Sequence, residues 1–357
     1  DEGHLPMSIW DTYPSNYRSQ EVQFILNAVS AGECVSLVGL SGAGKSNLTG
    51  FLTHRINNGP CFYFVDCNTL TTTDPAFLIT VLFHTIDESE APMVSFQTLS
   101  AKIRQKVNAT SNGICFVLDR FDVYQPGSTE TKAVENNLRA LRDQFKYDLT
   151  FIISTRRPLD PGSELAELFL ANTLWLGPLN HEDSIWSIQS FALRHGLQWN
   201  STTQEQIYKH SQGYPSILRA ICEAHASGIP LDLDTLRKSD AVHRRVKELW
   251  NDSPEEATLE KCGIQNHPFL SKSQKKISGE ELTANEQRLM TYLNAHQGQI
   301  CTKEDLIAAV WPEEKLIAGL RDDSLTQLIH RLREKLGPKE NGEIQTLSGR
   351  GYRFKID

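Results

Sequence analysis

The sequence predicts an α/β fold in which a parallel sheet with helices on both faces is followed by a helical lid and a smaller C-terminal domain. Three observations predict this arrangement. Short apolar segments alternate with amphipathic ones over the first half of the chain, a glycine-rich stretch follows an early apolar segment, and three helical patterns precede two short strand patterns near the end. A chain of 357 residues is long enough for two or three domains.

The composition is typical of a globular, water-soluble protein, because 39% of the residues are hydrophobic and 22% are charged. No run of about 18 apolar residues occurs and no apolar signal segment opens the chain, so we expect a cytoplasmic protein without a membrane partner. The seven cysteines show no paired spacing, so we expect reduced core residues rather than a metal site. The net charge of −8 argues against nucleic acid over the whole surface but leaves room for a local basic face.

The stretch GLSGAGKS at 39–46 has the spacing G-x-x-x-x-G-K-[ST], between an apolar strand pattern and the start of a helical pattern. Glycines allow backbone N–H groups to close around phosphates, and we expect Lys45 to reach the β- and γ-phosphates and Ser46 to hold Mg²⁺. A chance glycine-rich turn is the alternative. The pattern predicts a P-loop NTPase fold that binds ATP or ADP with Mg²⁺, and its expected nucleotide-binding residues are Gly39, Gly42, Ala43, Gly44, Lys45, Ser46 and Asn47.

A second apolar strand pattern, at 114–119, ends in Asp119. We expect Asp119 to hold Mg²⁺, as the Walker B carboxylate of P-loop NTPases does, and an acidic strand cap is the alternative. Many P-loop ATPases have glutamate at the next position, but this chain has Arg120, which cannot act as a base at neutral pH. Asp122 is the nearest spare carboxylate. The candidate catalytic residues are therefore Lys45, Asp119 and Asp122, and ATP hydrolysis, if present, is expected to be slow.

Further strand patterns at 61–66, 149–155 and 172–176, with helical patterns between them, extend the predicted parallel sheet. The strand at 149–155 runs into Arg156 and Arg157. A cation at a strand end beside the P-loop can sense the γ-phosphate, so we expect Arg156 to contact the nucleotide. A surface arginine pair is the alternative.

These segments together resemble the signal-transduction ATPases with numerous domains, the STAND group, near the NB-ARC and Orc/Cdc6 ATPases of AAA+ type. The resemblance rests on the P-loop and Walker B segments and on three short elements: Arg18 and Glu21, with Tyr17 in place of the family's glycine, Ser154-Thr155-Arg156, and Gly213-Tyr214-Pro215. It implies that Arg18 contributes to the nucleotide site, that Arg156 contacts the γ-phosphate and that Pro215 packs near the adenine. A plain N-cap at Arg18 and a plain turn at Gly213 are the alternatives.

Four segments with helical periodicity predict a lid, and the last of them reads as one helix over 233–250. Beyond Asn251 the periodicity weakens, and the segment 271–276 is polar and basic, which is typical of a linker. We therefore expect four parts: a nucleotide-binding domain at 10–180, the lid at 181–262, a linker at 263–277 and a C-terminal domain at 278–357.

The C-terminal domain shows three helical patterns followed by a hairpin pattern, which predicts a winged helix-turn-helix. Thr283 and Glu286 form a capping-box pattern, Thr302 is the expected N-cap of the second helix, and the third helix covers 323–336. The domain closely resembles the DNA-binding domain of OmpR/PhoB-type response regulators. The residues that carry this resemblance are Leu282-Thr283, Glu286, Asp305-Leu306, Val310-Trp311, Leu332-Arg333, Lys335-Leu336-Gly337, Thr346 and Gly349-Arg350-Gly351-Tyr352-Arg353-Phe354.

The resemblance implies that the third helix enters the major groove of double-stranded DNA and that the wing contacts the minor groove or the backbone. Seven Lys or Arg stand against three Glu between Ser324 and Ile356, so this region is basic within an acidic chain. The alternative is a winged helix that contacts another protein instead of DNA. Arg333 has its own alternative, a partly structural role. We expect Gln327, Leu328, His330 and Arg331 to face base edges or nearby phosphates, and the phosphate candidates are Arg333, Lys335, Arg350 and Arg353.

The combination of a P-loop domain and a winged helix in one chain predicts an ATP-binding, nucleotide-switched, DNA-binding transcriptional regulator of STAND type. In it, the P-loop domain replaces the usual receiver domain. Self-assembly into a homo-oligomer on DNA is a further expectation. Two alternatives stay open: a DNA-dependent ATPase resembling an Orc/Cdc6 initiator or remodelling factor, and a STAND-type scaffold in defence signalling.

Overall fold

A computed structural model describes residues 9–57, 59–87, 93–124, 126–270, 283–311, 320–336, 343–347 and 351–355. The chain divides into two compact units, Asp1–Leu270 and Ser271–Asp357. The side chains of residues 284, 320–324 and 334–336 lie outside the description. Each unit is considered by itself.

The first unit contains the predicted parallel sheet, whose five strands are in the order β2-β3-β4-β1-β5 and all pair in parallel. Every residue of the three central strands is buried, because helices cover both faces of a parallel sheet. The strands are β1 (Val35–Val38), β2 (Cys61–Asp66), β3 (Ile114–Asp119), β4 (Leu149–Thr155) and β5 (Thr173–Trp175).

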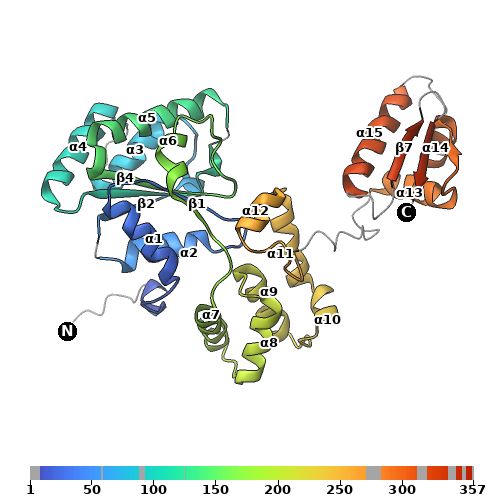
Figure 1. The fold of residues 1–357 in the computed structure, drawn as a ribbon, viewed down its shortest axis with the longest axis horizontal. Helices are drawn as coiled ribbons and strands as arrows, with labels where there is room; N and C mark the ends of the chain where they lie inside the picture. Colours follow the sequence, from blue (N-terminus) through green and yellow to red (C-terminus); the bar gives the residue numbers. More distant parts are fainter. Residues whose placement is uncertain are drawn as a thin grey trace. The chain divides into compact units, whose positions relative to one another are not determined.

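The helices of this unit form two layers, one on each face of the sheet (Figure 1). Side chains along β3 alternate between the two: Phe116 and Leu118 pack with helices α3, α4 and α5, whereas Cys115 and Val117 pack with α1 and α2. The α4 helix has no counterpart among the expected elements. The bounds are α1 (Ser19–Ser30), α2 (Lys45–Arg55), α3 (Pro75–Ile86), α4 (Phe96–Ala109), α5 (Thr129–Phe145) and the short α6 (Ala166–Phe169).

Short 3₁₀ segments connect several of these elements. They are η1 (Ile9–Thr12), η2 (Cys67–Thr69), η3 (Phe121–Val123), η4 (Lys146–Asp148) and η5 (Leu170–Asn172). The η3 segment directly follows β3, so it carries Asp122 past the C-terminal end of the sheet, where a P-loop fold binds its ligand.

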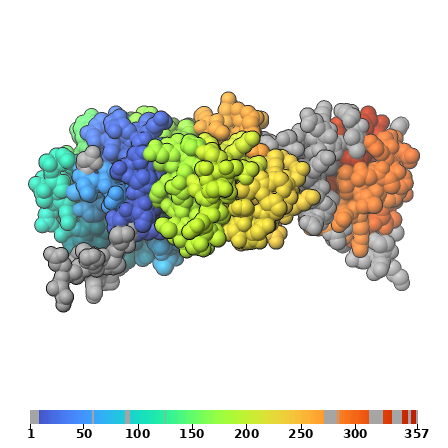
Figure 2. Space-filling model, turned by 90° about the horizontal axis from the view of Figure 1, so that it is seen from below, coloured from blue at the N-terminus to red at the C-terminus, as the bar shows by residue number. Residues whose placement is uncertain are grey.

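The predicted lid is helical, and its helices share a core with the α1 and α2 face of the sheet. Figure 2 shows the yellow-green lid against the blue N-terminal segment, where the backbone N–H of Arg18 donates to Asp183 over 3.0 Å. The prediction of a single helix over 233–250 is wrong, because the helix is interrupted at Lys238 and Ser239. The helices are α7 (His181–Arg194), α8 (Ser201–Ser211), α9 (Pro215–Ala226), α10 (Leu233–Arg237), α11 (Asp240–Asn251) and α12 (Glu256–Lys261).

The boundary between the two units lies later than the start of the expected linker at 263. Ile264, Phe269 and Leu270 are buried in the same core as Leu40 and Tyr214. Apolar side chains that bury themselves against the P-loop and the lid cannot serve as a solvated spacer, so the segment through Leu270 belongs to the first unit.

The second unit has the predicted order of helices and wing strands. Thr283 and Thr302 both form capping boxes, with Glu286 and Asp305 respectively. The expected hairpin is part of a three-stranded antiparallel sheet in the order β6-β8-β7. The elements are α13 (Ala284–Ala295), β6 (Ile300–Cys301), α14 (Lys303–Val310), α15 (Leu320–Leu336), β7 (Glu343–Leu347) and β8 (Gly351–Lys355).

In the part of the chain that the structure describes, no helix is both long enough and apolar enough to traverse a lipid bilayer.

Candidate nucleotide site and nucleic-acid interface

The P-loop connects β1 to α2 at the C-terminal edge of the sheet. Its first residue, Gly39, donates its N–H to the Thr155 carbonyl over 3.0 Å, which ties the loop to the neighbouring strand β4. Gly42 and Gly44 have φ angles of +81° and +91°. Residues that carry a side chain rarely adopt this left-handed backbone conformation, so the loop needs glycine at both positions.

The loop has the features that a polyphosphate requires. The α2 helix begins at Lys45, and the N–H groups of a first helical turn lack partners within the helix, so they are available to an anion. A cavity of about 710 Å³ opens at the loop and is lined by Gly42, Gly44, Lys45, Ser46 and Asn47 among others. A helix N-terminus, a lysine and a glycine loop around one cavity fit a phosphorylated ligand.

Lys45 is held by the loop that contains it. Its Nζ donates to the carbonyl oxygens of Gly39 and Leu40. Burial lowers the pKa of Lys45, whereas the nearby carboxylates of Asp122, Asp119 and Asp252 act in the opposite direction and favour the charged ammonium. The ammonium group therefore lies among three negative side chains.

Ser46 and Asp119 meet as a Mg²⁺ site requires, although they come from different elements. The Ser46 hydroxyl donates to Asp119 Oδ2 over 2.6 Å, and Ser154 on β4 donates to Oδ1 over 2.5 Å. Asp119 is only 1% exposed. A hydroxyl and a carboxylate are oxygen ligands of the kind that Mg²⁺ binds, so the pair fits this ion.

Asp122 and Arg156 lie together in the wall of the cavity. The backbone N–H of Arg156 donates to both carboxylate oxygens of Asp122, over 2.8 and 3.1 Å. The Arg156 guanidinium donates to Asp252 over 2.9 Å. The structure thus brings the two predicted residues to the P-loop and adds a third, acidic residue from the lid.

Arg18 does not line this cavity in the way that the resemblance implies. Its guanidinium is 1% exposed and donates to the carbonyls of Ala43 and Gly177, over 3.0 and 3.1 Å, and to Glu21 over 2.7 Å. These contacts tie the P-loop to the segment after β5. Arg18 therefore braces the loop from within the protein, and its direct contact with a nucleotide remains a prediction.

The start of α9 holds the outer side of the loop. The Tyr214 hydroxyl donates to the Ser41 carbonyl over 2.7 Å, and the Ser216 N–H donates to the Gly42 carbonyl over 3.1 Å. Pro215 lines the cavity between them, as expected for a residue of the site. The preceding Gly213 has φ +76°, and an added Cβ would lie 2.3 Å from the Leu179 carbonyl oxygen, so the turn requires glycine.

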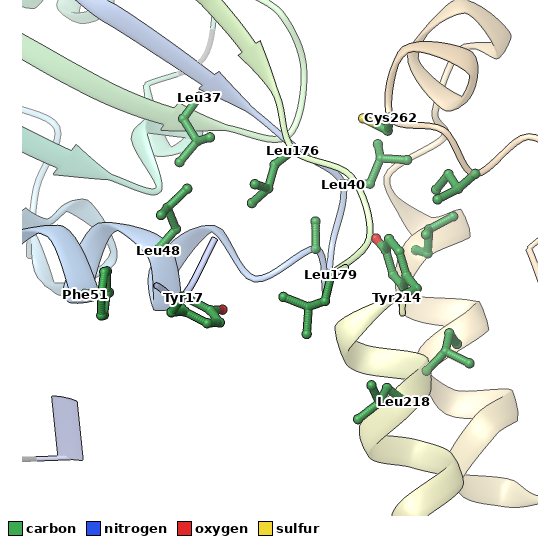
Figure 3. Packing of buried hydrophobic residues seen from close by; sticks show 14 of the residues in the cluster. Tyr17, Leu37, Leu40, Leu48, Phe51, Leu176, Leu179, Tyr214, Leu218 and Cys262 are labelled. Carbon is green, nitrogen blue, oxygen red and sulfur yellow. The ribbon is translucent and has the colours of Figure 1, made fainter. Parts of the chain in front are cut away.

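Apolar side chains support the loop from behind (Figure 3). Leu40, at the start of the loop, belongs to one buried cluster with Leu176, Leu179, Tyr214 and Cys262. These residues come from the loop, the segment after β5, the lid and the end of α12. The loop and the lid are therefore joined by packed contacts as well as hydrogen bonds.

Sequence reasoning missed several residues at the cavity. Arg120, named above only as an unsuitable base, has φ +57°, donates to Asp66 over 3.2 Å and lines the cavity. No motif marks the other residues, although Arg219 lies one helical turn after Pro215. The additional residues at the loop or cavity are Asn68, Arg219, Arg245 and Asp252.

The third helix of the second unit, α15, separates its residues into two faces. Gln327, His330 and Arg331 are exposed and lie at helical spacing on one side, as an interface with DNA requires. Leu328, expected beside them, is 2% exposed and packs in the core, so the expectation for this residue is wrong. The apolar stripe of the helix includes it.

Two of the residues expected to contact phosphates instead donate hydrogen bonds to residues of the wing sheet. Arg333 donates to the Ile344 carbonyl over 2.9 and 2.7 Å and to Thr346 Oγ1 over 2.7 Å. Arg353 donates to Gln345 over 2.9 Å. Arg333 therefore fastens the helix to β7, which favours its structural interpretation. The Lys335 side chain and Arg350 lie outside the described residues.

Residues 278–354 match the family model described as "Transcriptional regulatory protein, C terminal". The chain is 30% identical to the sensory transduction protein BceR of Halalkalibacterium halodurans over 130 residues. This match covers 36% of the chain and 54% of that protein. BceR of Bacillus subtilis is 32% identical over 130 residues, or 34% of the chain and 52% of that protein. The chain thus spans about half the length of the curated relatives that it matches.

Solved structures similar to the whole chain include the Walker-type ATPase of Pyrococcus abyssi, at 14% identity and a TM-score of 0.47 over 97% of both chains. The Orc1 protein of Aeropyrum pernix in complex with DNA has 11% identity and a TM-score of 0.37 over 95% of this chain and 89% of that one. From its own motifs, its fold and the matched C-terminal family, the chain joins a P-loop α/β unit to a winged helix of OmpR/PhoB type.

Proposed function

We propose that the chain is an ATP-binding, nucleotide-switched, DNA-binding regulator of transcription of STAND type. The observation that carries this proposal is the bonding of the lid to the P-loop backbone by Tyr214, Ser216 and Asp252. A nucleotide in the loop would act on these contacts, and the lid would respond to which nucleotide is bound.

The nucleotide would lie with its phosphates on the P-loop, between Lys45 and the first turn of α2. Ser46 and Asp119 would hold Mg²⁺, whose charge offsets that of the phosphates, and Arg156 would contact the γ-phosphate. Pro215 would pack near the base. The cavity of about 710 Å³ is within the range that small-molecule ligands occupy in proteins.

Double-stranded DNA would bind to the exposed face of α15. Gln327, His330 and Arg331 can reach base edges or phosphates, since they are exposed at helical spacing. The match of residues 278–354 to a family of transcriptional regulators supports this assignment, as do the relatives named as sensory transduction proteins. The state of the nucleotide site would then set how the winged helix engages DNA, or whether copies of the chain assemble on it.

The test uses the full chain and a duplex selected by the protein from a random pool. Its affinity is measured by fluorescence anisotropy with Mg-ATP, with Mg-ADP and without nucleotide, for the wild type and Lys45→Ala. We expect the wild-type affinity to differ between nucleotide states by about five-fold or more, and the variant to lose this difference. Equal wild-type affinities in all three states would contradict the switch.

One observation keeps a DNA-dependent ATPase as the second candidate: Asp122 lines the cavity, and its field acts on Lys45. Its carboxylate already accepts the Arg156 N–H, which limits its ability to orient water. ATP turnover that rises strongly with DNA and disappears in Asp122→Ala would favour this candidate over a slow switch.

A further inference from the structure

Asp252 is an acidic residue that the fold inserts into the nucleotide site from the lid. It directly follows α11 and is 7% exposed. Its Oδ2 accepts the Ser41 N–H of the P-loop over 3.0 Å, and its Oδ1 accepts the Arg156 guanidinium over 2.9 Å. Its backbone carbonyl accepts Arg157 over 2.8 Å. Both carboxylate oxygens are thus fixed, one on the loop and one on a predicted sensor of the γ-phosphate.

The charge of Asp252 acts where a triphosphate would place its own charge. Lys45, expected at the β- and γ-phosphates, is within the field of this carboxylate as well as those of Asp119 and Asp122. Asp119 also bonds to Ser46, with which it can share Mg²⁺. Asp252 instead bonds to a backbone amide and a guanidinium, so nothing in its contacts suits it to a metal.

We propose that Asp252 makes the site prefer a nucleoside diphosphate to a triphosphate, an inference that rests on the proposed binding of nucleotide at the P-loop. A diphosphate leaves the pair of Arg156 and Asp252 in place. A terminal phosphate competes with Asp252 for Arg156 and is repelled by the carboxylate, so triphosphate binding requires the pair to separate.

Separation of this pair acts on the segment that leads out of the first unit. Asp252 precedes α12, and Leu259, Cys262 and Ile264 in the residues that follow pack into the cluster around Leu40. Figure 3 shows Cys262 and Leu40 in this cluster. Leu40 is the neighbour of Ser41, whose N–H Asp252 accepts. Loss of the Asp252 contacts therefore loosens residues 253–270 on the P-loop, and a triphosphate would have this effect where a diphosphate would not.

The experiment measures the affinities of Mg-ADP and Mg-ATP for the full chain by isothermal titration calorimetry. The variants are Asp252→Asn, which keeps the size and one acceptor oxygen but removes the charge, and Asp252→Ala. The control is Asp234→Asn, a lid carboxylate whose side chain is 87% exposed and which pairs with Arg237 of its own helix. Circular dichroism verifies that each variant is folded, and Asp252→Asn carries the test if the alanine variant unfolds.

We expect Asp252→Asn to bind Mg-ATP about ten-fold more tightly relative to Mg-ADP than the wild type does, with Mg-ADP affinity changed by less than about two-fold. The control should keep the wild-type ratio. An unchanged ratio in Asp252→Asn, with both nucleotides still bound, would overturn the role of Asp252 alone. A wild type that binds neither nucleotide would overturn the proposed function, and the inference with it.

A second measurement separates this role from a purely structural tie. Hydrogen exchange of residues 253–270 in the wild type should be faster with Mg-ATP than with Mg-ADP, whereas in Asp252→Asn the two nucleotides should give similar, fast exchange. Equal protection of this segment with both nucleotides in the wild type would contradict the proposed separation.

Discussion

The P-loop site and the exposed face of α15 hold their polar residues in opposite ways. Ser46, Asp119, Arg156 and Asp252 are bonded to one another or to the loop, across elements that lie far apart in the sequence. Arg331, by contrast, stands on an exposed helical face whose stability comes from the apolar stripe beneath it. In the first arrangement, a ligand at the P-loop would act on side chains that also hold the structure together. In the second, the side chains proposed to contact DNA lie apart from the apolar stripe that packs the helix.

This contrast has a direct consequence for experiments. A substitution at Asp119 or Asp252 should affect both the stability of the first unit and the site, because the Ser46 hydroxyl or the Ser41 N–H then loses its acceptor. A substitution on the exposed face of α15 should affect DNA binding and leave the stability of the second unit nearly unchanged. The predictions below test whether the two units behave in this way.

The largest effect is expected from a core substitution in the second unit. Phe354 is fully buried among Leu289, Leu306 and Leu332. Phe354→Ala should lower the free energy of unfolding of this unit by about 3–5 kcal/mol through lost burial and a cavity. Hydrogen exchange of residues 343–355 in a denaturant series measures it. Nucleotide affinity should be unchanged, and a parallel loss of it would break the separation of the units.

Lys45→Ala should have the next largest effect, on nucleotide binding. Hydrogen bonds from a charged group contribute about 1.5–3 kcal/mol each, so loss of the ammonium should weaken Mg-ATP binding by roughly 100-fold. Displacement of a fluorescent nucleotide measures it. Lys209→Ala, at an exposed lid position, should bind as the wild type does. Retained binding in the Lys45 variant would show that the loop is not the nucleotide site.

Arg331 and Arg333 should behave differently although they are two residues apart on one helix. Arg333→Ala should destabilise the second unit by about 1–3 kcal/mol, because the buried Ile344 carbonyl loses its donor. Arg331→Ala should leave stability within about 0.5 kcal/mol of the wild type. It should weaken duplex binding and reduce the dependence of log affinity on log salt concentration by about 1, if it contacts a phosphate.

Thermal unfolding and anisotropy at several salt concentrations supply both measurements. The reverse outcome, in which Arg331→Ala destabilises and Arg333→Ala does not, would show that the two faces of α15 are wrongly assigned.

Contiguous motifs explain what could be predicted from the sequence. The P-loop is one stretch of eight residues between a strand and a helix. Asp119 ends another strand of the same parallel sheet at the same edge, so its contact with Ser46 follows from the parallel arrangement. The winged helix is likewise a fixed order of elements in a short segment. Local pattern and a known topology were sufficient for both.

Asp252 shows why the rest could not be predicted. In the sequence it lies at the end of a helical pattern and before Ser253-Pro254, which is how many helices end. Its contact with Ser41 depends on how the lid folds back onto the sheet, and no local pattern records that. The break of the expected helix over 233–250 has a similar origin, since α10 and α11 both bury apolar residues and so continue the same periodicity.

The smallest predicted effect concerns His267, a buried group in the segment that closes the first unit. Its Nε2 donates to the Ser211 carbonyl over 2.7 Å, and its Nδ1 accepts the Phe269 N–H over 3.2 Å, so the neutral ring uses both nitrogens. Burial lowers the pKa of His267. The unfolded chain therefore binds the proton more readily, and stability present above the ordinary histidine pKa of about 6.5 should be lost as the pH falls below that value.

The slope of this loss cannot exceed about 1.4 kcal/mol per pH unit for one proton, and urea unfolding of the wild type between about pH 7.5 and 5.5 measures it. His267→Gln should flatten the slope because it removes the titrating ring, whereas His210→Gln, at a lid position outside this network, should keep it. Equal slopes in the wild type and His267→Gln would mean that acid acts on the first unit through other groups. A flattened slope would extend the contrast between the units, since a polar group buried in the first unit would then govern its response to acid, as Asp252 is proposed to govern its response to nucleotide.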